Sequence, residues 1–207
     1  SRTGLGNFDN NIMRTECDAA GDMAGMNFKV DCLVNRRGEI ASLYAGPFRA
    51  THARGAEDGK VHYGIPYRTG YDIVVSNAYG KANESAIALS FLVMLLKTGA
   101  QGTGVLIADS PEGQVPHYVF RAWGSDYGGR HFAARGKGFI PLLMKRLIVL
   151  NPAPDRTFLD LVCDNGDAEV VKTWPEVLAM LEKEYPSDAR VAVVPDGTVQ
   201  YLMQPGA

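Results

Sequence analysis

The chain has 207 residues, 46% of them hydrophobic, and a formal net charge of −2. Its length and apolar content fit a globular protein with a buried core. The near-neutral charge and the lack of a basic run argue against nucleic acid or an anionic membrane as the partner. No apolar run approaches the roughly 18 residues that a membrane-spanning helix needs.

The cysteines are few and widely spaced: Cys17, Cys32 and Cys163. Their odd number and separation argue against a disulfide framework and favour a reducing compartment, so we expect a cytoplasmic protein. The sequence has no Cys-x-x-Cys motif and no paired histidine spacing, so we expect no metal ligands in this chain. It begins at Ser1 without a signal-peptide pattern, which we interpret as a fragment of a longer polypeptide.

The first third of the chain predicts two helices and a hairpin. Residues 11–23 carry apolar side chains near helical spacing, and residues 28–34 alternate apolar and polar side chains as a strand does. A turn at residues 35–38 separates them from a partner strand at 39–45, which indicates an antiparallel hairpin. The next expected elements are a helix at 49–59 and a strand at 61–65.

The middle of the chain predicts a strand–helix–strand unit. Residues 72–76 and 103–108 are short apolar runs of the kind found in buried parallel strands. Between them lie a polar loop at 77–82 and an apolar helix that starts near Asn83. Because the strands of such a unit are parallel, this loop and the loop at 109–114 open on the same edge of the sheet.

The last third adds a strand at 147–150 and a helix with a capping box, in which Thr173 precedes Glu176 by three residues. We expect that helix to run to about Tyr185 with Val177, Leu178 and Leu181 facing inward. A strand at 190–194 and an Asp-Gly turn predict a second hairpin. The remaining expectations are helices at 117–123 and 132–146, an ambiguous segment at 157–163, and a final strand at 199–202.

Strands that alternate with helices predict an α/β fold. We expect an open, mostly parallel (mixed) sheet with helices on both faces, plus an antiparallel hairpin. A chain of this length fits a single α/β domain over residues 1–207. If the chain is a fragment, as its first residues suggest, we expect it to be the C-terminal half of a longer, two-domain protein.

The loop after the strand at 72–76 is the first candidate for a binding site. It carries Asn77, Tyr79, Lys81 and Asn83 just ahead of a helix. Loops at the carboxyl ends of strands bind ligands in open α/β sheets, and helix N-termini favour anions. An ordinary polar connection explains the same residues without any ligand.

Several short motifs follow one another along the chain: Asn11-Ile-Met-Arg14 with Met23-Ala-Gly-Met-Asn-Phe28, Tyr44-Ala-Gly46 with Ala50-Thr-His52 and Gly55, Asp72-Ile-Val-Val-Ser-Asn77-Ala-Tyr79, Gly104-Val-Leu-Ile-Ala108 with Glu112-Gly113, and Val191-Ala-Val-Val-Pro195-Asp-Gly197. In this order they resemble the C-terminal half of the lactate racemase-like family, the nickel-pincer nucleotide enzymes. The resemblance spans nearly the whole chain and rests on order and spacing, because each motif is only moderately specific.

The resemblance implies a racemase or epimerase of 2-hydroxy acids, an isomerase in which the nickel-pincer nucleotide accepts and returns a hydride. In that family the paired catalytic histidines and the cofactor-anchoring lysine belong to the N-terminal domain. This chain would then contain no catalytic residue, bind the cofactor weakly and be inactive alone. Its partner would be the N-terminal domain of the same polypeptide. This chain would close over the site. Its residues Asn77, Tyr79, Lys81 and Asn83 would orient the substrate or cofactor, and Glu112 and Gly113 would form the far wall.

The chain departs from that pattern on the helix after the loop. Members of the family share a Gln and a Lys one helical turn apart. This chain has Ile87 and Ser90 at those positions. An apolar group replaces the amide, a hydroxyl replaces the cation, and Ile87 cannot hold an ion-paired carboxylate, so the resemblance implies a substrate other than lactate. Lys81 is the candidate replacement for the missing cation.

Two other functions fit the same residues. The chain can be a non-catalytic α/β module that binds an anion or a nucleotide, which suits the loss of the Gln and the Lys. It can also be a structural domain whose loop edge docks another domain. The residues assigned to the enzyme site also have ordinary explanations: Tyr79 as a half-buried aromatic residue, Lys81 as a solvated lysine and Glu112 as a surface carboxylate.

Overall fold

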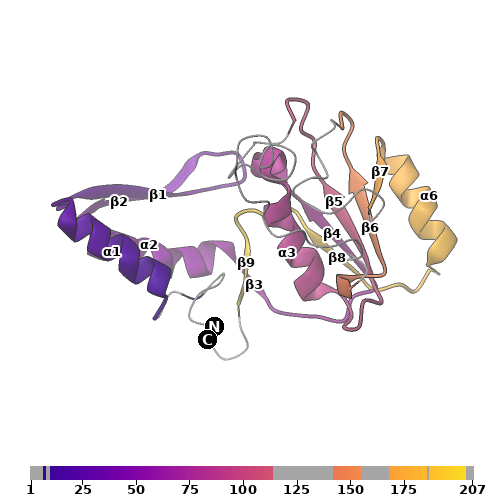
Figure 1. The fold of residues 1–207 in the computed structure, drawn as a ribbon, viewed down its shortest axis with the longest axis horizontal. Coiled ribbons are helices and arrows are strands. Elements are labelled where there is room, and N and C mark those ends of the chain that lie inside the picture. The colour runs from indigo at the N-terminus through magenta and orange to yellow at the C-terminus, as the bar shows by residue number, and fades with distance from the viewer. Residues whose placement is uncertain (1–6, 8–9, 114–141, 155–167, 186, 204–207) are drawn as a thin grey trace, which may run out of the picture. The chain divides into compact units, whose positions relative to one another are not determined.

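The structure is a computed structural model that describes residues 7, 10–113, 142–154, 168–185 and 187–203. The chain divides into two compact units (Figure 1). Unit 1 comprises residues 1–67 and 199–207, and unit 2 comprises residues 68–198. The expected single domain stays a prediction, because two compact units can still fold cooperatively.

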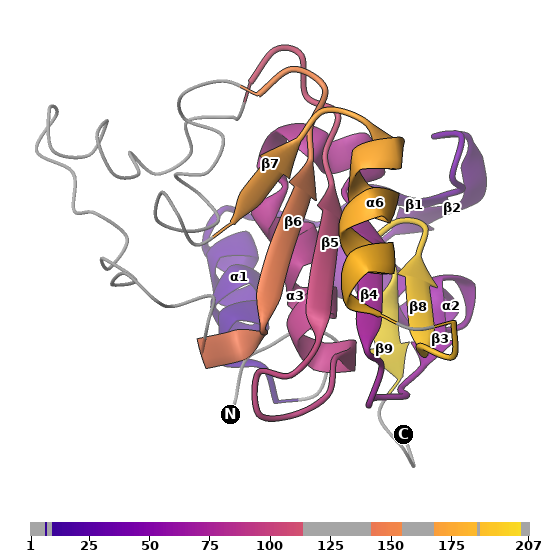
Figure 2. The same cartoon turned by 90° about the vertical axis from the view of Figure 1, so that its right-hand side faces the viewer.

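A parallel sheet of five strands forms the centre of unit 2. Its strands lie side by side in the order β7, β6, β5, β4, β8 (Figure 2). They are β4 (Ile73–Asn77), β5 (Thr103–Ile107), β6 (Arg146–Leu150), β7 (Glu169–Val171) and β8 (Val191–Val194). The predicted open, mostly parallel sheet is confirmed. β4 and β5 are mostly apolar because both of their faces are covered.

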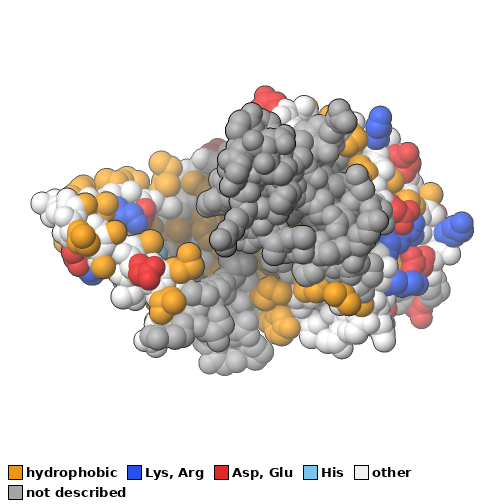
Figure 3. All heavy atoms as spheres, viewed as in Figure 1, with side chains coloured by type: hydrophobic (Ala, Val, Ile, Leu, Met, Phe, Trp, Pro, Cys, Tyr) orange, Lys and Arg blue, Asp and Glu red, His pale blue; other side chains and the backbone are white. Residues whose placement is uncertain are grey.

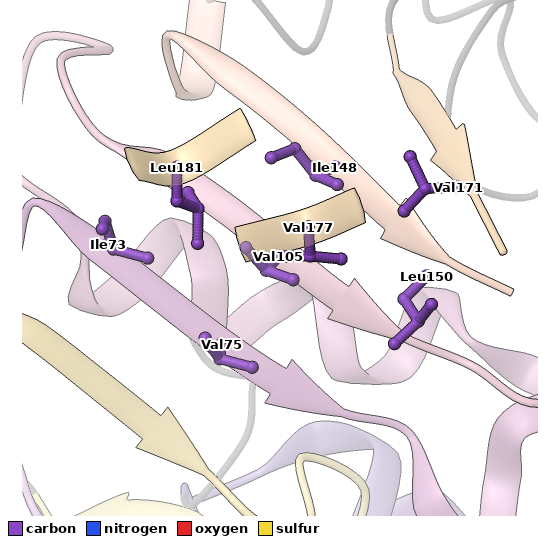
Figure 4. Close-up of a cluster of buried hydrophobic side chains, with 8 residues drawn as sticks. All are labelled: Ile73, Val75, Val105, Ile148, Leu150, Val171, Val177 and Leu181. Carbon is purple, nitrogen blue, oxygen red and sulfur yellow. The ribbon is translucent and has the colours of Figure 1, made fainter. Parts of the chain in front are cut away.

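Helices cover both faces of this sheet, as predicted. Helix α6 (Trp174–Glu184) packs on one face through Val177 and Leu181, which are buried. Helix α3 (Ala86–Leu95) lies on the other, where the Ser76 hydroxyl donates a hydrogen bond of 2.9 Å to the Ala88 carbonyl. The buried cluster under α6 is drawn in Figure 4 and consists of Ile73, Val75, Val105, Ile148, Leu150, Val171, Val177 and Leu181. Burial of each such side chain stabilises the fold by about 1.5–3 kcal/mol.

The start of α6 follows the predicted capping box. The Glu176 carboxylate accepts hydrogen bonds from the backbone N–H and the hydroxyl of Thr173, both at 2.8 Å, and from Lys172 N–H at 3.0 Å. The bonds with Thr173 hold the pKa of Glu176 below its ordinary value. The prediction that Leu178 faces inward is wrong. Leu178 is 38% exposed, because it lies about 100° around the helix from the buried Val177.

Unit 1 is built from two helices and two pairs of strands. Strands β1 and β2 form the predicted antiparallel hairpin, and β3 pairs with β9 in parallel. The bounds are α1 (Ile12–Met23), β1 (Lys29–Val34), β2 (Ile40–Gly46), α2 (Phe48–Tyr63), β3 (Gly64–Pro66) and β9 (Tyr201–Met203). In the hairpin turn, Asn35 Oδ1 accepts from the backbone N–H groups of Arg37 and Glu39, and Gly38 has a φ of 77°.

Helix α2 is longer than predicted. The sequence suggested that it stops at Gly59 and that a strand covers 61–65, but the helix continues to Tyr63 and only Gly64–Pro66 is a strand. Gly55 and Gly59 lie one turn apart on the helix. A Cβ on either residue would lie 3.7 Å from Tyr44 or Leu33 of the hairpin, an ordinary contact distance, so this side of α2 faces the hairpin.

The predicted C-terminal hairpin is wrong. β8 pairs in parallel with β4, and β9 pairs in parallel with β3, so the Asp196-Gly197 turn joins two different sheets. An Asp-Gly pair indicates a reversal of the chain but not the partner of the next strand. The segments 117–123 and 157–163 lie outside the described residues. So does most of 132–146, whose last residue, Arg146, begins β6. None of the described helices combines the length and apolar character needed to cross a membrane.

Candidate functional site at the carboxyl edge of the sheet

The two candidate loops leave the same edge of the unit 2 sheet. β4 and β5 are parallel neighbours, and Asn77 at the end of β4 lies opposite Ile107 at the end of β5. The loop that follows Asn77 and the loop that contains Glu112 therefore start side by side. This confirms the predicted shared edge, on which the whole candidate site depends.

The Asn77 loop is held by hydrogen bonds near its start. Asn77 Oδ1 accepts from Tyr79 N–H at 3.0 Å, and Ala78 N–H donates to the Ile107 carbonyl at 2.8 Å. Tyr79 has a φ of 33° and its side chain is 54% exposed. A tyrosine in this left-handed region is unusual, and such strain is found most often where a side chain is held for function. The loop thus fixes Tyr79 at the surface of this edge.

Lys81 already has an anionic partner. Residues Tyr79–Glu84 form short 3₁₀ turns that are separated by a kink at Lys81, and Lys81 Nζ lies 2.7 Å from a carboxylate oxygen of Glu84. The expected helix start near Asn83 is wrong, since α3 begins at Ala86 with Ser85 as its N-cap. The carboxylate of Glu84 therefore stands near the helix N-terminus that was expected to bind an anion. Asn83 is exposed on this 3₁₀ turn.

The second loop is a tight turn from Ser110 to Gly113. Gly113 N–H donates to the Ser110 carbonyl at 3.0 Å, and the Ser110 hydroxyl donates to the Gly113 carbonyl at 2.5 Å. Gly113 has a φ of 81° and is buried, as is Ser110. Glu112 stands at the tip and is exposed. Gly113 therefore shapes the loop, and Glu112 is the side chain that a ligand can reach.

The structure adds Asn151, which sequence reasoning missed, to this edge. Asn151 follows β6 and is fully buried. Its Oδ1 accepts from Ala153 N–H at 3.0 Å, whereas its Nδ2 has no hydrogen-bond partner among the described residues. Such an orphaned donor costs about 1–3 kcal/mol. A polar residue directly after an apolar strand was the signal used for Asn77, and the same signal would have found Asn151.

The switch point of the sheet lies between β4 and β8, where open α/β folds most often bind ligands. Here the turn after β8 fills it. Gly197 N–H donates to the Asn77 carbonyl at 2.8 Å, and a Cβ on Gly197 would lie 2.3 Å from the Ser76 hydroxyl oxygen. Asp196 is buried and accepts from Thr198 N–H and its hydroxyl at 3.0 and 2.6 Å. The loops after β4 and β5 remain as the walls of the candidate site.

Carboxylates outnumber lysines among the described residues of this edge. The charged residues there are Lys81, Lys172, Glu84, Asp109, Glu112, Glu176 and Asp196. An excess of carboxylates along one edge disfavours a further negative charge there. The described part of the edge therefore suits hydroxyl groups better than a free carboxylate.

Ile87 and Ser90 lie one turn apart on the first half of α3. Ile87 is exposed, and the Ser90 hydroxyl donates to the Ile87 carbonyl at 2.9 Å. The hydroxyl is thus used by its own helix. Neither residue supplies an amide or a cation to the site.

No family model matches the sequence, and no curated protein matches it. Among solved structures, the apoprotein of the lactate racemase from Thermoanaerobacterium thermosaccharolyticum matches with a TM-score of 0.68 and 16% sequence identity. The match covers 95% of this chain and 50% of that chain. The chain has the fold of half a lactate racemase. At this identity the lactate racemase match establishes the fold alone, and it agrees with the order of motifs along the sequence.

Proposed function

We propose that this chain is the C-terminal half of a 2-hydroxy acid racemase or epimerase that works by hydride transfer on a nickel-pincer cofactor. The observation that carries the proposal is the lactate racemase fold over 95% of the chain. The sequence motifs point to the same family independently of the coordinates. The activity belongs to the complete polypeptide, since the chain spans about half the length of that racemase.

In this proposal the carboxyl edge of the unit 2 sheet orients the substrate. The Tyr79 phenol and the Asn83 amide are exposed polar groups that can hydrogen-bond a hydroxyl. Lys81 can meet a carboxylate only by giving up its 2.7 Å ion pair with Glu84. The Lys81 side chain is 55% exposed and can be reached by a ligand, whereas the Glu84 side chain is only 12% exposed. A substrate carboxylate must therefore replace a largely buried partner of Lys81.

The described residues of this chain do not fit the cofactor on their own. They contain no group of three His, Cys, Asp or Glu side chains that could hold a metal ion. No chemical step is therefore assigned to this chain, and the residues that hold and activate the cofactor belong to the other half. What this chain adds is positioning of the substrate.

The substrate is a 2-hydroxy acid other than lactate. Ile87 presents an apolar surface where the family has an amide, and the Ser90 hydroxyl is bonded to its own helix. An apolar wall favours a substrate whose third substituent is larger and more apolar than a methyl group. Each additional buried methylene contributes about 0.8 kcal/mol to binding.

The test is a racemisation assay on the complete polypeptide loaded with cofactor. Single enantiomers of a panel of 2-hydroxy acids are incubated, and the products are resolved by chiral chromatography. We expect interconversion of a branched or aromatic acid and slower reaction of lactate. Lys81→Ala should lower kcat/KM by about tenfold or more, since hydrogen bonds to charged groups contribute about 1.5–3 kcal/mol. Lys183→Ala, an exposed lysine of α6, serves as the control. No interconversion of any acid would refute the proposal.

A non-catalytic binding module is the second candidate. The Lys81–Glu84 ion pair and the replacement of the family's Gln and Lys by Ile87 and Ser90 favour it, because these residues no longer offer an amide or a free cation to a substrate. Calorimetry separates the two. Binding of a hydroxy acid or a nucleotide by the complete polypeptide, without any turnover, would identify a module of this kind.

A further inference from the structure

The loop after β4 carries a lysine whose backbone is tied to the sheet. Ala78 N–H donates to the Ile107 carbonyl at the end of β5, and Lys81 N–H donates to the Ala78 carbonyl, both at 2.8 Å. Lys81 has a φ of −125° and a ψ of 32°, which interrupt the 3₁₀ turns, and the residue is exposed. A ligand at this edge of the sheet therefore meets the lysine in a defined place.

Among the described residues, Lys81 is the lysine that a ligand between the loops after β4 and β5 can reach. The other lysine of this edge, Lys172, follows β7, and strands β5 and β6 separate β7 from β4. Neighbouring strands lie about 4.8 Å apart, so this separation is roughly 14 Å. In Figure 3 acidic side chains mark the upper border near the loop after β5, and the basic side chains of that border lie toward β7 and α6. The described cation for an acid bound between these loops is therefore Lys81.

The partner of Lys81 within the chain is the same chemical group that a hydroxy acid would offer. Glu84 Oε2 lies 2.7 Å from Lys81 Nζ. Glu84 is the less exposed of the two side chains, so the protein holds the carboxylate while the ammonium group meets water. An acid that binds Lys81 must displace this carboxylate from the ammonium group and then lie beside it as a like charge, which opposes binding.

We propose that Glu84 is a specificity-determining residue of this site, because its carboxylate competes with the carboxylate of a substrate for Lys81. This inference rests on the proposed function and adds to it a residue that weakens the binding of free acids. The competition is the same for every acid. The acids that still bind are those that make further contacts, as with the exposed side chains of Tyr79 and Ile87. A neutral amide does not compete with Glu84.

The test compares an acid with its amide. Mandelate and mandelamide have nearly the same shape, but only mandelate is charged at neutral pH. Their affinities for the 207-residue chain are measured by nuclear magnetic resonance titration of the backbone amides. Glu84→Gln keeps the size of the side chain and removes its charge. We expect it to raise the affinity for mandelate by about tenfold or more, the effect of a hydrogen bond to a charged group, and to leave the affinity for mandelamide unchanged.

Two further variants assign the change to Lys81. In the Glu84→Gln background, Lys81→Met should remove the gain for mandelate, because the freed ammonium group is then absent. Asp109→Asn removes a carboxylate from the same edge, at the exposed start of the loop after β5. It should change the ratio of acid to amide affinity much less, because salt screens exposed charges. This ratio does not depend on the folded fraction of a variant, so a partly unfolded variant still reports it.

Four results would overturn the proposal. They are an unchanged ratio in Glu84→Gln, a gain that survives Lys81→Met, an equal gain in Asp109→Asn, and no binding of either ligand by any variant. Ligand binding does not require turnover. A raised ratio beside a complete polypeptide without racemase activity would refute the proposed function and leave the role of Glu84 standing. Racemisation beside an unchanged ratio would do the opposite.

Discussion

Gly197 fills the space between the ends of β4 and β8 that other open α/β sheets leave for a ligand. Its backbone N–H bonds the Asn77 carbonyl at 2.8 Å, so it also fixes the residue from which the candidate loop begins. A Cβ there would lie 2.3 Å from the Ser76 hydroxyl oxygen and 3.0 Å from the Ala88 Cβ. Because Gly197 has no side chain, its backbone can lie close enough to the sheet to bond the start of the loop.

Gly197→Ala should destabilise the protein by about 1–3 kcal/mol, the usual cost of overpacking a filled site. Urea unfolding followed by circular dichroism measures the change. Gly80→Ala is the control, since a Cβ at Gly80 meets no atom within 4 Å, and it should change stability by less than about 0.5 kcal/mol. Equal stability of the two variants would contradict the close packing described here.

The residue types predicted where the loops lie, but they did not predict which groups the loop side chains bond. The polar residues after β4 identified Asn77 and Tyr79, because a strand that ends in a polar loop is readable in one sequence. The pairing of Lys81 with Glu84 depends on the kinked backbone at Lys81, which the sequence alone does not reveal. Asn151 was missed because the Asn-Pro sequence fits an ordinary turn equally well.

At the scale of elements, the N-terminus of α6 is held by one carboxylate. Glu176 accepts hydrogen bonds from the backbone N–H groups of Lys172 and Thr173 and from the Thr173 hydroxyl. These groups would otherwise lack a partner within the helix. Helix α6 in turn covers the apolar face of the sheet, so its first turn contributes to the whole of unit 2.

Glu176→Ala should lower the urea midpoint at neutral pH because these hydrogen bonds are lost. The pKa of Glu176 is lowered in the folded protein, mainly by its bond with the Thr173 hydroxyl. Its contribution is therefore present above the unfolded pKa of about 4.3 and is lost as the pH falls through the folded pKa. Unfolding curves at pH 7 and pH 3 measure this, with Glu182→Ala as an exposed control on the same helix. A deficit that persists unchanged at pH 3 would exclude the carboxylate as its cause.

Element types were predictable and their partners were not. The apolar runs of β4, β5 and β6 were found because strands buried on both faces contain few polar residues. The second hairpin failed because the partner of β9 is β3, more than 130 residues earlier in the sequence. Local turn chemistry carries no information about such distant pairing.

On the scale of the whole molecule, unit 2 is one continuous segment, whereas unit 1 is assembled from both ends of the chain. Strand β9 reaches its partner β3 only after the chain has passed through all of unit 2. Unit 2 contains its own buried cluster between the sheet and α6. The two units therefore differ in how much they depend on the rest of the polypeptide.

A fragment of residues 68–198 should fold by itself and unfold cooperatively. A fragment of residues 1–67 should be less stable, because it lacks β9 and leaves β3 without its partner strand. Circular dichroism and the amide dispersion in nuclear magnetic resonance spectra distinguish the two states. A folded 1–67 fragment beside an unfolded 68–198 fragment would reverse this assignment of stability.

Strand β8 forms one border of the unit 2 sheet, and its sequence Val-Ala-Val-Val has no charge and no proline. In a parallel pair alternate residues bond the neighbour, so the backbone amides of Val191 and Val193 point away from β4. Natural proteins usually guard such a border with lysine, proline or a bulge, because it recruits further strands. The isolated chain is therefore prone to aggregate through β8, and a solubilising charge placed on that border is the first change to make for crystallisation.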